Sequence, residues 1–154
     1  MDYLMLKLIH ILSSTILFGT GLGTAFFMVR ANISNDIQTL KTTTKSVVLA
    51  DWVFTTPAVI IQPFTGFLLM KSLNYSFDSL WFYLVVGLYL LTGACWIPVV
   101  YIQSKLKDLA QATQNWDNLS EAYFRLYKTW LTLGVPAFVS VLIIFYLMIY
   151  KPYL

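Results

Sequence analysis

His10 is the only histidine in the chain and the residue best suited to chemistry. It lies in the apolar run that begins at Tyr3, three residues after Lys7. A neutral imidazole can ligate a metal or exchange hydrogen bonds, and an imidazole in hydrocarbon usually has a partner or a ligand. The spacing between His10 and the lone cysteine, Cys95, does not indicate a catalytic nucleophile with a histidine as its base. His10 is therefore the first candidate for a binding site and the candidate metal ligand.

Other polar residues recur at helical spacing, because positions three, four, seven or eleven apart return to one face of a helix. Three such faces occur: Lys7, His10, Ser14, Gly21 and Met28; then Asp51, Thr55, Ala58, Gln62 and Thr65; then Thr129, Thr132, Pro136 and Ser140. Lipid would leave these polar groups without hydrogen-bond partners. Each face is therefore predicted to point into the protein interior.

The helical rise of 1.5 Å per residue gives the depth of each polar group. His10 lies about 10 Å from Tyr3 and Gln62 about 12 Å from Met70, so these two side chains are predicted to meet. Asp51 lies about 8 Å from the opposite end, too far from His10 for a direct dyad. We interpret Asp51 as half of an ion pair with Arg30, Lys45 or Lys128. The predicted cofactor-binding set is His10, Lys7, Ser14, Gln62 and Asp51.

The elements that position these residues are four apolar stretches. The chain is 58% hydrophobic and 11% charged, whereas soluble domains carry about 25% charged residues. Each stretch exceeds the roughly 20 residues that cross a bilayer, and all should be helices, since open strands leave backbone groups unpaired in lipid. The stretches are residues 3–29, 46–70, 79–103 and 127–150. The sequence predicts an all-α integral membrane four-helix bundle, a single domain over residues 1–154.

The basic residues predict the orientation of these helices, because Lys and Arg near the ends of spans stay in the cytoplasm. Seven of the ten Lys and Arg residues lie beside the first and third connections. They are Arg30, Lys41, Lys45, Lys105, Lys107, Arg125 and Lys128. Both termini are therefore predicted to be periplasmic. The basic connections are explained by orientation and by contact with membrane lipids, not by nucleic acid.

Several motifs resemble a bacterial integral membrane family known as domain of unknown function 2269. The matching runs are Leu6-Lys-Leu-Ile-His-Ile-Leu-Ser-Ser, Leu17-Phe-Gly-Thr-Gly-Leu-Gly-Thr-Ala-Phe, Ala50-Asp-Trp-Val-Phe-Thr-Thr-Pro-Ala-Val, Gln62-Pro-Phe-Thr-Gly and Gly93-Ala-Cys-Trp-Ile-Pro-Val-Val. The resemblance covers nearly the whole chain. It implies a multi-pass protein of the bacterial inner membrane, in a family without an assigned activity.

The Leu-Lys-x-x-His opening is also distantly similar to HemJ-type protoporphyrinogen oxidases and to the membrane domain of CopD-type copper proteins. This similarity implies that His10 is an axial ligand of haem b and that Lys7 pairs with a porphyrin propionate. The HemJ pattern has further histidines that this chain lacks. Two histidine ligands from one protomer are therefore impossible, and the second ligand would be methionine, water or His10 of another protomer.

Non-enzymatic alternatives remain open, namely a membrane transport or assembly subunit, in a homo-oligomer or with a partner subunit. Cu(I) favours thioether and imidazole, and Met5, His10, Met70 and Met148 fall on the predicted outer side. A quinone or lipid carbonyl between the helices could bond to His10 and Gln62. Whether the protein is an enzyme is left open. We expect His10→Ala to fold and to lose whatever ligand copurifies.

Overall fold

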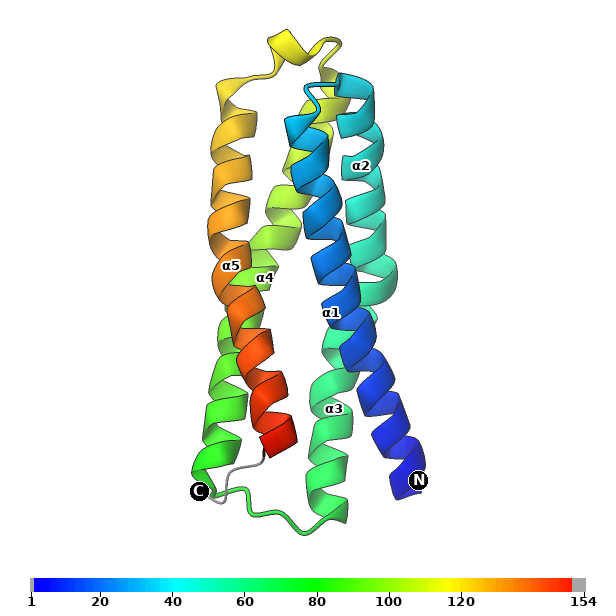
Figure 1. Cartoon of the computed structure of the whole chain (residues 1–154), viewed down its shortest axis with the longest axis vertical. Coiled ribbons are helices and arrows are strands. Elements are labelled where there is room, and N and C mark those ends of the chain that lie inside the picture. Colours follow the sequence, from blue (N-terminus) through cyan, green and yellow to red (C-terminus); the bar gives the residue numbers. More distant parts are fainter. Residues whose placement is uncertain (1, 151–154) are drawn as a thin grey trace. The chain divides into compact units, whose positions relative to one another are not determined.

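The computed structural model describes residues 2–150, which form helices joined by short connections, with no strand in that range (Figure 1). Four helical stretches are long and apolar enough to cross a membrane: Tyr3–Ile33, Ile37–Ser72, Leu80–Ala112 and Glu121–Tyr150. The elements are α1 (Tyr3–Ile33), α2 (Ile37–Ala50), η1 (Asp51–Thr55), α3 (Thr56–Ser72), α4 (Leu80–Ala112), η2 (Trp116–Asn118) and α5 (Glu121–Tyr150). The predicted all-α membrane fold with four spans is confirmed.

The helices extend past the spans predicted from hydropathy. The second stretch begins at Ile37, nine residues before the predicted span at Ser46, and the third ends at Ala112. The first connection is therefore a tight turn in which Asn35 has a positive φ of 52° and the Asp36 carboxylate accepts hydrogen bonds from the first turn of α2. Side-chain capping of exposed N–H groups lets a helix start in a polar segment that hydropathy assigns to a loop.

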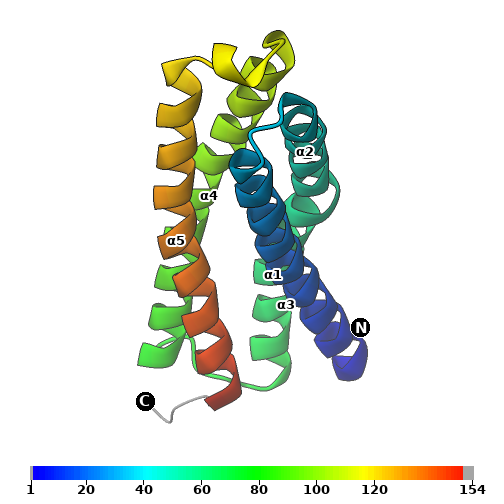
Figure 2. The same cartoon turned by 45° about the horizontal axis from the view of Figure 1, so that its top comes forward.

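Two compact units make up the chain, Met1–Ser76 and Phe77–Leu154. In the first unit, α1 packs along α2, η1 and α3, as both views show (Figures 1 and 2). Its core is apolar and includes residues of all three α-helices: Leu6, Met28, Ala31, Leu40, Val47, Ala58 and Met70. The polar side chains of interest in this unit are therefore held between packed helices rather than on loops.

In the second unit, α4 packs against α5. Leu106, Ala110 and Tyr123 are fully buried there, and the Trp81 indole Nε1 donates to the Leu147 backbone oxygen at 2.8 Å. Ser120 caps the start of α5, because its Oγ accepts a hydrogen bond from the backbone N–H of Tyr123 at 3.3 Å.

A π-helical turn, η1, joins α2 to α3. The backbone N–H of Thr56 bonds to the Asp51 carbonyl, five residues earlier, and the Thr56 hydroxyl donates to the same oxygen at 2.9 Å. Pro57 follows and has no N–H for the α-helical bond to Val53, so the regular pattern cannot continue through this point. The wider turn accommodates the proline without ending the helix, and it separates Asp51 from the polar face of α3.

Candidate functional site

His10 on α1 forms a hydrogen bond with Thr65 on α3. The His10 Nδ1 and Thr65 Oγ1 atoms are 2.7 Å apart, although the two residues are 55 positions apart in sequence. His10 is half-buried and Thr65 is buried. Gly66 follows on α3, where an added Cβ would lie 3.4 Å from His10 Cε1. That distance is an ordinary van der Waals contact, so the imidazole lies directly beside α3 at Gly66.

The direction of the His10–Thr65 bond depends on which neighbour receives the Thr65 hydroxyl hydrogen. The Thr65 hydroxyl donates to the Ile61 carbonyl at 2.8 Å, with the Gln62 carbonyl at 3.2 Å. A hydroxyl has one hydrogen, so the Thr65 oxygen acts as an acceptor towards His10 when that hydrogen goes to Ile61, and as a donor when it goes to Nδ1. In the first of these two arrangements His10 Nδ1 carries the proton. In a neutral imidazole this arrangement leaves Nε2 unprotonated, with its lone pair available.

Gln62 forms a second bridge between α3 and α1. Its Nε2 donates to the His10 backbone oxygen at 2.7 Å and to Ser13 Oγ at 2.5 Å. A backbone carbonyl cannot donate, so the amide must present its NH₂ group here, which fixes the amide orientation. The Ser13 hydroxyl in turn donates to the His10 carbonyl at 3.1 Å. The predicted meeting of His10 and Gln62 at one depth is thus what the structure shows.

These bonds decide which chemistry the cluster can offer. Both hydrogens of the Gln62 amide are used within the protein, and so is the Nδ1 proton of His10 when the Thr65 hydroxyl donates to Ile61. The imidazole Nε2 remains as a Lewis base and hydrogen-bond acceptor. Such a site favours a metal ion or a hydrogen-bond donor over a ligand carbonyl. Hydrogen bonding through one ring nitrogen is also the usual way in which proteins orient a metal-ligating histidine.

Two further members of the predicted set lie beside this cluster without joining it. The Ser14 hydroxyl donates to the Ile11 carbonyl of its own helix at 2.8 Å, and it is Ser13 that contacts Gln62. Lys7 is exposed, with its Nζ 5.9 Å from the centre of the Tyr3 ring. Ser13 was missed because Ser13 and Ser14 follow His10 by three and four residues, and spacing alone does not separate them.

Asp51 forms a separate polar group in η1. Its side chain is buried, and its Oδ1 accepts a hydrogen bond from the Thr55 hydroxyl at 2.8 Å. Eleven residues separate Asp51 from Gln62, which corresponds to about 16 Å along the helix. The expected separation of His10 and Asp51 into two levels therefore agrees with the structure. The ion pair between Asp51 and a basic residue stays a prediction.

No cluster of acidic, cysteine and histidine ligands forms around His10 within the described part of the chain. Among residues 2–150, no group of three His, Cys, Asp or Glu side chains could hold a metal ion. Of the methionines considered for Cu(I), Met70 is buried in the core of the first unit and Met5 is exposed. A metal at this site would thus depend on one protein nitrogen, His10 Nε2, together with ligands of its own or from another molecule.

Comparison with known families identifies the family of the chain. A family model described as predicted integral membrane protein (DUF2269) matches residues 4–152. The chain belongs to this family. No curated protein and no solved structure matches it. The resemblance to domain of unknown function 2269 is therefore confirmed, together with the assignment as an integral membrane protein. The distant similarity to HemJ-type and CopD-type proteins is not confirmed by these comparisons.

Proposed function

We propose that this DUF2269 protein binds a cofactor in the membrane and that His10 Nε2 is an axial ligand of haem b. The observation that carries the proposal is the 2.7 Å hydrogen bond between His10 Nδ1 and Thr65 Oγ1, and the proposal assigns the Thr65 hydroxyl hydrogen to Ile61 and the imidazole proton to Nδ1. This bond leaves Nε2 as the free base and holds the ring plane fixed. Both properties are those of a proximal haem histidine.

The remaining residues have supporting roles in this proposal. Gln62 and Ser13 fix the backbone around His10, so the imidazole is carried on a rigid pair of helices. Lys7 lies one helical turn nearer the membrane surface and is exposed, so its ammonium can pair with a propionate. Bound haem would supply a redox-active iron. Its second axial position would be taken by water, by methionine, or by His10 of a second protomer in a homo-oligomer.

The hydrogen-bond pattern also ranks the alternatives. A quinone carbonyl needs a donor, and the donors of His10 Nδ1 and Gln62 Nε2 are already used. Cu(I) needs further soft ligands, and Met5 is exposed rather than turned into the core. Haem needs one lone pair from this cluster and contributes four nitrogens itself. Haem is therefore the ligand that this arrangement supports best.

An absorption spectrum of the protein tests the proposal. We expect the protein to show a Soret band when it is purified in detergent from cells supplied with a haem precursor, with iron in proportion to haem. The absence of a Soret band, with neither haem nor iron bound, would remove haem from the site. Copper found by metal analysis, or a quinone in the organic extract, would replace haem by that ligand.

We also propose that the protein lies in a bacterial inner membrane with both termini on the periplasmic side, because seven of ten basic residues flank the first and third connections. Single cysteines at exposed positions 38 and 76, made as Gln38→Cys and Ser76→Cys in a Cys95→Ser background, test this orientation. We expect an impermeant maleimide to label position 76 in intact spheroplasts and position 38 only after lysis. The opposite pattern would place the termini in the cytoplasm.

A further inference from the structure

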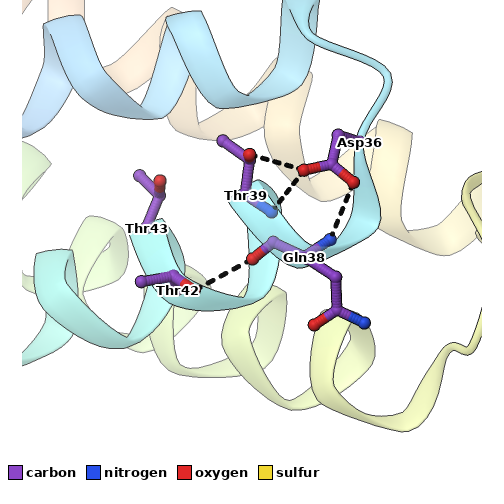
Figure 3. Close-up of a pocket in the computed structure, with 5 residues that line it drawn as sticks. All are labelled: Asp36, Gln38, Thr39, Thr42 and Thr43. Atoms are coloured by element: carbon purple, nitrogen blue, oxygen red, sulfur yellow. Dashed lines mark hydrogen bonds between the residues drawn. The ribbon is translucent and has the colours of Figure 1, made fainter.

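The hollow at the start of α2 is explained by helix capping (Figure 3). The Asp36 carboxylate accepts hydrogen bonds from the hydroxyl and the backbone N–H of Thr39, and the Thr42 hydroxyl donates to the Gln38 carbonyl. Such bonds satisfy the polar groups of a first helical turn from within the helix. The hollow therefore needs no ligand to satisfy these groups.

Two polar atoms of the second unit, in contrast, are buried without a hydrogen-bond partner. They are Gln103 Oε1 on α4 and Trp130 Nε1 on α5, and neither is bonded within residues 2–150. Nearly all buried polar atoms in proteins bond to protein or to ordered water, because an unbonded one costs free energy. The amide oxygen is an acceptor and the indole nitrogen is a donor. The pair therefore calls for a partner that can both donate and accept.

Both side chains lie on the contact face of the α4–α5 pair. The buried residues of α4 in this region are spaced four, three and four apart, namely Val99, Gln103, Leu106 and Ala110. On α5 the buried residues Tyr123 and Trp130 are seven apart. This spacing marks one face of a packed helix, and α4 packs against α5. Gln103 is 4% exposed and Trp130 is 6% exposed, so both point towards the neighbouring helix rather than towards lipid.

The two side chains converge along the helix axes. The bond from Trp81 to Leu147 sets the register of α4 against α5, and counting inwards from it along both helices places Gln103 level with Arg125 and Trp130 level with Pro98. Five residues of α4 separate these levels, which corresponds to about 7.5 Å. Helical side chains lean towards the N-terminus of their own helix. Because the helices are antiparallel, Gln103 and Trp130 lean towards each other from opposite ends of this gap.

We infer that a buried water molecule bridges Gln103 and Trp130. The water accepts the indole N–H and donates one hydrogen to the amide oxygen, so it satisfies both atoms at once. Converging side chains between two packed helices leave space for a small ligand only, and water is the smallest molecule that both donates and accepts. Buried waters usually occupy such positions, between polar groups that cannot reach each other.

This bridge lies near one surface of the membrane and apart from the cofactor site. Counting about 20 residues along α4 from Leu80 reaches Val99, so Gln103 lies about one helical turn beyond the hydrocarbon, where water is available. His10 belongs to the first unit and the bridge to the second, so neither site depends on the other. Trp96 Nε1 is also buried without a partner in the described chain, but Trp96 lies about two turns from Gln103 on the same helix and leans away from it.

Nuclear magnetic resonance of the protein in detergent micelles, with its tryptophan indoles isotope-labelled, tests the bridge. We expect the Trp130 indole proton, assigned by its loss in Trp130→Phe, to show a dipolar cross peak with water. In Gln103→Met this peak should fall at least about fivefold, the ratio that one net hydrogen bond gives, since methionine keeps the chain length but cannot hold the water. Absence of the peak in the unaltered protein, or a peak of equal size in Gln103→Met, would overturn the inference.

A double-mutant cycle measures the same bridge through thermal stability. Gln103→Met and Trp130→Phe each leave the water with one partner, whereas the double variant removes both partners. The combined loss in melting temperature should therefore be smaller than the sum of the single losses, by about 2–4 °C. Gln103→Met combined with Trp96→Phe is the matched control and should be additive. Additive losses in the first cycle, or equal non-additivity in both cycles, would contradict the bridge. If Gln103→Met does not fold, the water cross peak of the unaltered protein decides.

Discussion

The His10→Ala variant is expected to fold, to insert into the membrane and to purify without haem. Alanine keeps the His10 backbone carbonyl, so the bonds from Gln62 and Ser13 to that oxygen are retained. Thr65 loses a donor but still donates its own hydrogen to Ile61. No buried group of this cluster is thereby left with an unsatisfied N–H. The variant, however, lacks His10 Nε2, which is the nitrogen proposed to bind the iron. We expect the Soret-to-280 nm absorbance ratio to fall at least about tenfold, which requires the binding free energy to weaken by at least about 1.4 kcal/mol.

Ser14→Ala is the matched control, because Ser14 is close to His10 in sequence but its hydroxyl donates to the Ile11 carbonyl of its own helix. This control should keep the haem content of the unaltered protein. Added imidazole should restore part of the Soret band in His10→Ala, since it can occupy the space that the side chain leaves. A variant that keeps the full haem content would show that the iron is bound elsewhere. The proposal for His10 would then fail even if the protein binds haem.

The sequence was sufficient to predict the fold class and the depth of the main polar residues. Four apolar stretches of more than about 20 residues leave few options in lipid. The helical rise then placed His10 and Gln62 at one level from opposite helix ends, and the structure joins the Gln62 amide to the His10 carbonyl at 2.7 Å. Depth is predictable because it depends on residue number and on a fixed rise per residue.

The rotation of side chains around each helix was not predictable to the same degree. Ser13 and Ser14 are neighbours, and the choice between them depends on the crossing of α1 over α3, which hydropathy does not encode. The π-turn at Asp51–Thr55 likewise shifts the residues of α2 relative to those of α3. Thr65 lay on the predicted polar face, but its contact with His10 depends on how α1 and α3 pack, and that requires coordinates.

The Thr65→Val variant is expected to weaken haem binding about 10- to 100-fold, which is the usual cost of losing the group that orients a metal-ligating histidine. Valine has nearly the shape of threonine but cannot accept the Nδ1 proton. The buried N–H would then lack its partner, and the imidazole would avoid this cost by carrying the proton on Nε2 or by rotating. Either change removes the lone pair from the iron. Titration of the haem-free protein with haem measures the loss.

Thr65→Ser separates this positioning role from a packing role. Serine retains the hydroxyl, which can still donate to Ile61 and accept from His10, so we expect near-normal affinity together with an unaltered absorption spectrum. If Thr65 acted by packing alone, the serine variant, which removes a methyl group, would bind haem less well than the valine variant. Weak binding by both variants, or normal binding by the valine variant, would contradict the assigned tautomer. The order of the two haem affinities therefore tests whether the hydrogen bond between His10 and Thr65 keeps Nε2 free for the iron.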